Sequence, residues 1–177
     1  GAMGLTFVDQ VKGGNIPKEF IPAVQKGFAS AMANGALAGY KMDSMKITLL
    51  DGSFHPVDSD QLSFEIAARN GYRNAAPKAG SVIMEPIMSV EVVTPEENMG
   101  DIIGDLNKRR GRVMGMNPTG DGEQVLEAEV PMAEMMSYAI DLRSMTQSRG
   151  TFTFNFVRYE DCPAAAQEKA IAEAKAL

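Results

Sequence analysis

The stretch IMSVEVVTPEE, residues 87–97, decides the fold of the second half of the chain. Residues 87–93 are rich in β-branched side chains, which is typical of a strand. Thr94 and Pro95 suit the N-cap and the first position of a helix, and Glu97 stands three residues after the cap. We therefore predict a strand that passes directly into a helix, whose buried face is formed by Met99, Ile102, Ile103 and Leu106.

The chain after this helix alternates between the periods of strands and of a helix. We expect strands over residues 112–116, 125–130 and 151–156, with a helix between the last two. This helix begins at Pro131 or Met132, and its apolar face contains Met135, Met136, Ala139 and Leu142. The resulting order, β-α-β-β-α-β, is the ferredoxin-like order. It predicts a four-stranded antiparallel sheet with both helices on one face.

The pattern of residues before residue 87 predicts a smaller β-α-β unit. A short alternating strand covers residues 5–8, and Pro17 suits the first turn of a helix that Asn34-Gly35 would end. A second strand covers residues 45–50. After a loop, Asp58 or Ser59 would cap another helix that runs to Tyr72.

A linker and a change of charge separate the two halves. The segment 75–80 has the small residues, Pro and Gly of a helix exit. Up to Met84 the chain holds 8 basic and 7 acidic residues, whereas from Glu85 onward it holds 9 basic and 16 acidic ones. We predict an α+β protein with two small domains, at 1–84 and 85–160, and a C-terminal helix at 161–177.

Composition excludes several classes of protein. The 177 residues are 45% hydrophobic, which is globular composition, and the net charge of −6 counts against a general nucleic-acid binder with a basic surface. No window has about 18 uninterrupted apolar residues, so we expect no membrane partner. The single Cys162 excludes an internal disulfide and fits a reducing, cytoplasmic compartment.

The motifs of nucleotide binding and of common catalytic sites are missing from the sequence. Neither G-x-x-x-x-G-K-[ST] nor G-x-G-x-x-G occurs, so we expect no cofactor. His55 is the only histidine, which excludes a multi-histidine metal site. A hydrolase would have to combine His55 with Ser53, Asp58 or Ser59, and these neighbours are more simply explained as turn and capping residues.

Two groups of side chains remain as candidates for binding. The basic cluster, defined as Lys108, Arg109, Arg110 and Arg112, ends the predicted helix after residue 99. It can complement the negative end of that helix, with Gly111 as the left-handed residue, or it can contact phosphates. Arg143 and Arg149 flank the turn before the last strand and allow the same two interpretations.

The second candidate is the 52–59 loop, with the sequence GSFHPVDS. A polar loop between a strand and a helix can be an ordinary connection. It can also probe RNA, because Phe54 and His55 are able to stack on bases and His55 to hydrogen-bond to them.

Several of these segments together resemble bacterial elongation factor G. They are GGNIPKEFIPAV at residues 13–24, the 52–59 loop, EPIM at 85–88, TPEEN at 94–98, GDLNKRRG at 104–111 and LRSMT at 142–146. The resemblance runs from Leu5 to Pro163 and covers only the C-terminal part of that family: the latter portion of domain IV, domain V and the C-terminal helix. The missing phosphate loop agrees with this.

The resemblance implies a fold and partners for each part. It implies that the first domain is a truncated ribosomal-protein-like βαβ domain and that the second is the ferredoxin-like domain. The parent would be a GTPase that promotes tRNA–mRNA translocation, with GTP and Mg in the absent N-terminal part, while the fragment is not an enzyme. The 52–59 loop would lie near tRNA and mRNA at the decoding centre through Ser53, Phe54, His55, Pro56 and Asp58. The basic cluster would lie near ribosomal RNA and the stalk-base proteins of the large subunit.

Two alternative functions and one expectation about the truncated sheet stay open at this point. Ser148 and Gly150 stand where the family typically has Gly and Ala, so the parent can be a paralogue that acts in ribosome recycling or ribosomal protection. Ferredoxin-like domains also serve as ligand-binding regulatory modules. Finally, the strand around Phe7 would lack its upstream neighbours, and we expect its open edge to be covered by a symmetry mate, by a dimer partner or by the C-terminal helix.

Overall fold

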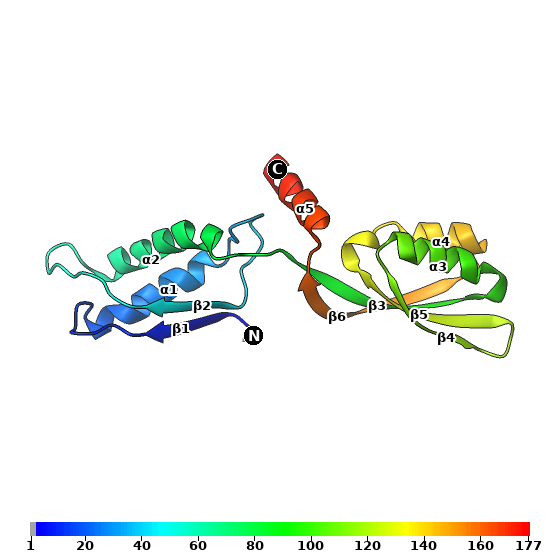
Figure 1. Cartoon of the computed structure of the whole chain (residues 1–177), viewed down its shortest axis with the longest axis horizontal. Helices are drawn as coiled ribbons and strands as arrows, with labels where there is room; N and C mark the ends of the chain where they lie inside the picture. The colour runs from blue at the N-terminus through cyan, green and yellow to red at the C-terminus, as the bar shows by residue number, and fades with distance from the viewer. Residues whose placement is uncertain (1–2) are drawn as a thin grey trace. The chain divides into compact units, whose positions relative to one another are not determined.

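Two separate sheets organise the chain in the computed structural model, which describes residues 3–177 (Figure 1). The first two residues of the predicted first domain lie outside the described residues. The chain divides into two compact units. The first contains the residues up to Ile83 together with Pro163–Leu177, and the second is Met84–Cys162. None of the helices in the described part of the chain is long and apolar enough to span a membrane.

The first unit is built on a parallel pair of strands. β1 (Leu5–Asp9) pairs with β2 (Met45–Leu49), and α1 (Ile21–Ala31) connects them after a 3₁₀ turn, η1 (Lys18–Phe20). A parallel pair requires such a crossover, because its strands run in the same direction. α2 (Gln61–Ala75) follows β2 and is extended by the 3₁₀ turn η2 (Ala76–Lys78).

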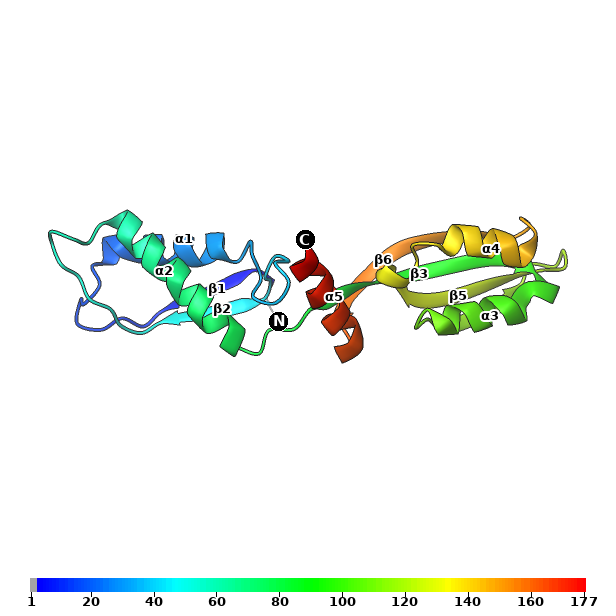
Figure 2. The ribbon, with the colours of Figure 1, turned by 90° about the horizontal axis from the view of Figure 1, so that it is seen from above.

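The helices α1 and α2 lie on the same side of the two strands, as the perpendicular views agree (Figures 1 and 2). Apolar side chains from α1, α2 and the loops fill the space between them: Ile16, Ala23, Val24, Phe64 and Ala68 are buried there. The unit also holds α5 (Ala164–Ala176), which is tied to Ile83 because the side-chain carbonyl of Gln167 accepts a hydrogen bond of 2.9 Å from its backbone N–H.

The second unit is a four-stranded antiparallel sheet in the order β4-β5-β3-β6. Its elements follow the chain as β3 (Met84–Pro95), η3 (Glu96–Asn98), α3 (Met99–Lys108), β4 (Arg112–Pro118), β5 (Glu123–Pro131), η4 (Met132–Glu134), α4 (Tyr138–Thr146) and β6 (Thr151–Asp161). The predicted α+β class, the two small domains and the ferredoxin-like order are therefore confirmed.

The helices α3 and α4 cover one face of this sheet, and the core lies between them and the strands (Figure 1). Val90 and Val92 of β3 alternate toward the helices, where they meet Ile102 and Leu106. At the base of the sheet, Met84 pairs with Asp161, so the first and last strands of the unit meet where the chain enters and leaves.

Several sequence expectations about helix ends were wrong. Thr94 does not cap a helix, because β3 continues through Pro95 and the buried Thr94 hydroxyl reaches the Pro95 carbonyl at 3.4 Å. The cap of α2 is Asp60, whose carboxylate accepts the Ser63 backbone N–H at 2.7 Å. α1 ends at Ala31, before the expected Asn34-Gly35.

The expected apolar face of α4 was only partly right: Leu142 is buried and Met135 packs against the core, whereas Met136 and Ala139 are exposed. A 3₁₀ turn follows Pro131, and the α-helix begins only at Tyr138. The later start places Tyr138, Leu142 and Thr146, at four-residue spacing, against the core. Met136 is consequently 94% exposed.

Candidate nucleic-acid interface

The 52–59 loop joins β2 to α2 and is held at both ends by packing and hydrogen bonds. Phe54 points inward: its ring stacks on Phe20 at 5.4 Å between centroids, and Phe20 stacks on Phe64 at 5.0 Å. A continuous stack of three rings thus connects the loop to the core of the first unit. Aromatic pairs in this arrangement contribute about 0.5–1.5 kcal/mol beyond the area they bury.

Hydrogen bonds fix the backbone of the same loop. The His55 carbonyl accepts the N–H groups of Asp58 and Ser59 at 3.1 and 2.9 Å, and the Ser59 hydroxyl accepts the His55 N–H at 3.0 Å. This closed turn is followed at once by the Asp60 cap of α2. The local sequence explains the arrangement, since Asp and Ser side chains readily bond to nearby backbone groups.

A second loop supports the entry to this turn. The Asn15 amide donates to the Asp51 carboxylate at 2.8 Å, which lowers the pKa of Asp51. A Cβ on Gly52 would fall 2.6 Å from the Ile16 side chain, so a larger residue there would force this buried side chain to move. The loop after β1 and the loop after β2 therefore form one end of the unit.

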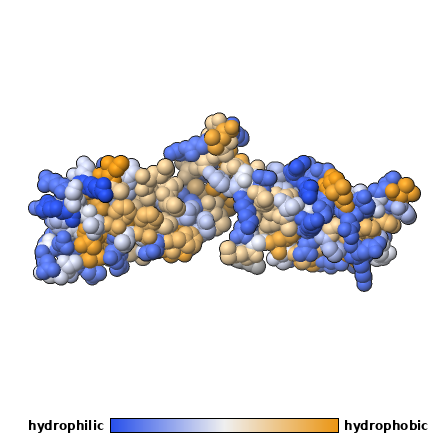
Figure 3. Space-filling view, turned by 180° about the vertical axis from the view of Figure 1, so that it is seen from behind, coloured by the Kyte–Doolittle hydropathy of each residue, from blue (hydrophilic) through white to orange (hydrophobic). Residues whose placement is uncertain are grey.

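The anchored loop presents four of its five predicted contact residues to solvent. Ser53, His55, Pro56 and Asp58 are exposed, whereas Phe54 is half-buried. Val57, which the sequence reasoning did not select, is 94% exposed. In Figure 3 the far end of this unit, where the loop lies, is largely hydrophilic with one isolated hydrophobic spot. Its exposure could have been predicted from its position between Pro56 and Asp58, inside a turn.

The basic cluster lies in the second unit, where α3 ends. The helix closes with a pair of backbone bonds, from Arg110 N–H to Asn107 and from Gly111 N–H to Leu106. Arg110 takes the left-handed conformation with φ of 59°, so the expectation that Gly111 would do so was wrong. Gly111 is required for a different reason: a Cβ there would fall 2.7 Å from the Leu106 carbonyl.

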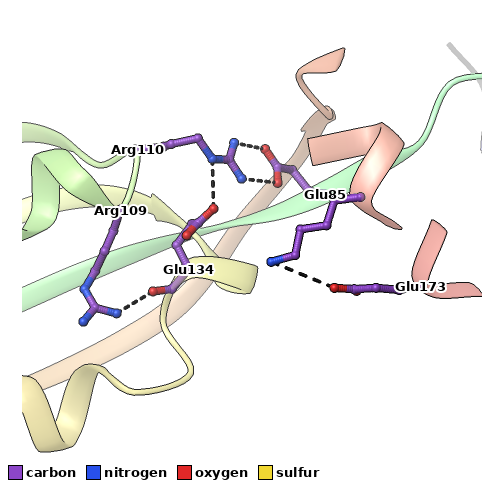
Figure 4. Close-up of polar contacts among 6 residues, drawn as sticks. Glu85, Arg109, Arg110, Glu134 and Glu173 are labelled. Atoms are coloured by element: carbon purple, nitrogen blue, oxygen red, sulfur yellow. Dashed lines mark hydrogen bonds and ion pairs between the residues drawn. The ribbon is translucent and has the colours of Figure 1, made fainter. Parts of the chain in front are cut away.

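Two arginines of the cluster form ion pairs inside the unit (Figure 4). Arg110 holds the buried Glu85 in a bidentate pair at 2.7 and 2.9 Å and also reaches Glu134 at 3.2 Å. This pairing lowers the pKa of Glu85 and raises that of Arg110. Arg109 bonds to Asp105 at 2.8 Å, to the Glu134 carbonyl at 2.6 Å and to Asp141.

Arg109 is also covered by an aromatic ring. Its guanidinium lies 5.1 Å from the centre of the Tyr138 ring, within the range of a cation–π contact. Only 11% of its side chain is exposed. Burial in turn raises the pKa of Tyr138. Arg109 is therefore part of the interior of the unit.

The remaining basic candidates differ in whether they form an ion pair within the unit and in how exposed they are. Arg112 pairs with Glu129 at 3.1 Å but stays 69% exposed. Arg149 pairs with Glu97 at 2.5 Å. Lys108 and Arg143 are exposed and make no ion pair with any residue from 3 to 177. The structure separates the candidates into those in the 52–59 loop and those in the second unit, and their contact with RNA stays a prediction.

Comparisons with known proteins match both units. A family model described as elongation factor G, domain IV, matches residues 1–80, and one described as elongation factor G C-terminus matches residues 82–170. An elongation factor G of Amoebophilus asiaticus (strain 5a2) is 58% identical over 163 residues, which are 92% of this chain and 23% of that protein. The chain thus spans about a quarter of the length of this relative.

A solved structure has the same fold. A crystal structure of a protein from Thermus thermophilus matches 98% of this chain with a TM-score of 0.82 and 34% identity. The match covers 26% of that protein. The resemblance inferred from the short motifs is therefore confirmed.

Proposed function

Because the chain belongs to the elongation factor G family, we propose that it is the ribosome-contacting C-terminal region of a cytoplasmic translational GTPase that promotes tRNA–mRNA translocation. In this proposal the chain itself is not an enzyme, and GTP with Mg binds in the other three quarters of the parent. The partners are ribosomal RNA, stalk-base proteins, and the tRNA and mRNA at the decoding centre.

The observation that carries the proposal is the anchored 52–59 loop. A loop that must keep tRNA and mRNA in register needs exposed groups on a stiff support, because a mobile loop would lose entropy on every contact. The stack of Phe54, Phe20 and Phe64 supplies the support. His55 and its exposed neighbours supply an imidazole and hydrogen-bonding groups of the kinds that recognise RNA.

The charge distribution supports transient binding. A chain with net charge −6 is not held on RNA by a general field, so its affinity must come from local points of contact. A translocation factor has to leave the ribosome in each cycle, and few contacts allow faster dissociation than many.

The experiment that tests the proposal is His55→Ala in the full-length parent. We expect tRNA–mRNA translocation to slow while ribosome-stimulated GTP hydrolysis stays near the wild-type rate, because His55 acts by contact and not by proton transfer. Gln25→Ala, an exposed residue of α1, is the matched control and should change neither rate. A parallel fall of GTP hydrolysis would refute this division of roles. Full translocation with splitting of ribosomes impaired would instead indicate a recycling paralogue.

A further inference from the structure

A groove lies between the C-terminal portions of α1 and α2, outside every candidate described so far. Its volume is about 290 Å³, and it is lined by Ser30, Ala31, Asn34, Arg69, Tyr72 and Arg73. None of these six residues is acidic. Figures 1 and 2 both show α1 and α2 side by side, so the groove belongs to the surface that the two helices share.

Close packing of the two helices fixes the walls of the groove. A Cβ on Gly27 would fall 2.6 Å from the Glu65 carbonyl and 2.7 Å from the Ala68 Cβ, so glycine lets α1 and α2 touch. Farther along, the buried Tyr72 donates its hydroxyl to the Asn34 carbonyl at 3.0 Å. The groove is thus bounded by a closely packed helix pair.

The arginines that line the groove are not fully neutralised by nearby carboxylates. Arg69 donates to the Ser30 hydroxyl at 3.2 Å and pairs with Glu65 at 3.3 Å. Lys26 also pairs with the Glu65 carboxylate, at 2.9 Å, so the negative charge of Glu65 is shared by two cations. Arg73 is exposed and has no ion-pair partner anywhere in residues 3–177.

Helix dipoles reduce this surplus without removing it. Contacts between Gly27 and Glu65, Ser30 and Arg69, and Asn34 and Tyr72 show that the helices run in the same direction. Their negative ends therefore lie together and amount to about half a charge each. Lys26, Arg69 and Arg73 against Glu65 leave two positive charges within the two helices, so the local balance stays positive.

We propose that this groove binds a phosphate group of an RNA backbone, with Arg73 as the principal donor and Arg69 as the second. The inference rests on the proposed function, which brings this unit to ribosomal RNA. Guanidinium groups donate two parallel hydrogen bonds to phosphate oxygens. The Ser30 hydroxyl donates to the Gly27 carbonyl at 3.0 Å and accepts from Arg69, so it positions that guanidinium and does not itself donate to the phosphate. Contacts of this kind position a protein on RNA without reading its sequence.

Salt dependence of ribosome binding tests the proposal directly. The chain is cosedimented with ribosomes over a series of KCl concentrations, and the slope of log K against log salt is measured. Each phosphate contact contributes about 0.7–0.9 to this slope. We expect Arg73→Gln to lower the slope by about that amount, and Arg69→Gln with Arg73→Gln to lower it further.

The control is Lys46→Gln, which removes the same charge from an exposed position on β2. It should leave the slope unchanged, and circular dichroism must show that each variant keeps the wild-type melting temperature. If Arg69→Gln alone unfolds the unit, the exposed Arg73→Gln still decides the question.

The possible results separate this proposal from the preceding one. If the wild-type chain does not sediment with ribosomes at any salt concentration, the proposed function fails and the groove proposal fails with it. If the wild type binds and Arg73→Gln has the same slope, only the groove proposal is overturned. Inorganic phosphate is the second probe: if it shifts the NMR signals of the groove while Arg73→Gln keeps the wild-type slope, the groove is a small-anion site and not an RNA contact.

Discussion

The 52–59 loop and the basic cluster use their polar side chains in opposite ways. In the loop the aromatic ring of Phe54 is turned inward, and His55 is exposed. In the cluster the guanidinium of Arg109 is buried, that of Arg110 is held by the buried Glu85, and Lys108 is left exposed. Apolar packing of Phe54 therefore fixes the loop and leaves its polar groups exposed. In the cluster, most of the charged groups are themselves used in ion pairs that fix the local structure.

This difference shows that the number of charges in a motif does not give the number available to a partner. Four basic residues within five positions indicate a phosphate-binding patch, yet Arg109, Arg110 and Arg112 each meet a carboxylate of the same unit. If the comparison is right, variants of the cluster should change stability and variants of the exposed loop residues should not.

The largest effect is expected for Glu85→Ala. Its side chain is 9% exposed and holds Arg110 through two bonds, so removing it leaves a cation that is 32% exposed with Glu134 alone. Loss of one partner of a buried pair costs about 3–5 kcal/mol, and the partial exposure of Arg110 reduces this to about 2–3 kcal/mol. Hydrogen exchange of the β3 and β5 amides reads the stability of the second unit by itself.

Arg112→Gln is the matched control for that experiment. Its ion pair is exposed at the arginine, and we expect a loss below about 1 kcal/mol. Equal losses in the two variants would mean that burial does not distinguish the members of the cluster.

A smaller effect is expected for Phe54→Ala, at about 1–2 kcal/mol. Truncating a fully buried Phe costs about 3–5 kcal/mol, and Phe54 is only half-buried. Urea unfolding followed by circular dichroism measures the shift of the midpoint. His55→Ala should stay within about 0.5 kcal/mol of the wild type, because it is an exposed residue. A large loss for His55→Ala would show that the imidazole also supports the loop.

Acid should weaken the second unit through Glu129. Hydrogen bonds from Arg158 and Arg112 lower the pKa of this carboxyl from about 4.5 to about 2. A group with a lowered pKa contributes stability that is complete above its unfolded value and is lost as the pH falls toward its folded value. We therefore expect stability to fall between about pH 5 and pH 2. Glu129→Gln should reduce that slope in urea unfolding series, and an unchanged slope would assign the loss to other carboxyls.

The turn before β6 offers a test with opposite signs at two neighbouring positions. Ser148 has φ of 66°, a conformation that costs a non-glycine residue about 1–2 kcal/mol. Ser148→Gly should stabilise by about 0.5–1 kcal/mol, since the flexibility of glycine in the unfolded chain offsets part of the gain. Gly150→Ala should destabilise by about 1 kcal/mol, because its Cβ would fall 2.9 Å from the Thr146 methyl group. Thermal melting decides both signs.

The weakest expected effect concerns association through the first sheet. Within the described residues only β1 and β2 form this sheet, so each has one edge without a strand partner. Unpaired edges favour pairing with a second copy, and we predict a concentration-dependent dimer in light scattering. Thr6→Pro, at an exposed position of β1, should abolish it, as proline removes a backbone donor. A strictly monomeric chain at high concentration would contradict the prediction.

The sequence predicted those parts of the fold that depend on local periodicity. All strands of the second unit and their succession along the chain followed from local patterns and turn residues, and so did the buried face of α3 with Ile102 and Leu106. Two of the errors, at Thr94 and at the start of α4, occurred where a 3₁₀ turn lies between strand and helix. The start of α4 shifted from Pro131 to Tyr138 because η4 uses three residues without continuing the helical period.

The candidate site was less accessible to sequence reasoning, because its chemistry depends on distant partners. The partners of Arg109 and Arg110 are 24–32 residues away, apart from Asp105, and no spacing rule identifies them. The groove next to Arg73 was missed because its other wall comes from α1, about 40 residues earlier in the chain. Arginines four residues apart on one helix, such as Arg69 and Arg73, are also common on solvated faces. The loop was found because its turn chemistry is local.

The pairing of Met84 with Asp161 has a consequence for how this protein can be cut and rearranged. The second unit interrupts the first, and its two chain connections leave from one rung of a ladder. Domains whose ends are this close tolerate transfer into the surface loop of an unrelated host. Residues 84–162 should therefore be portable as a single insert, and a protease that nicks one connection should leave the unit attached by the other.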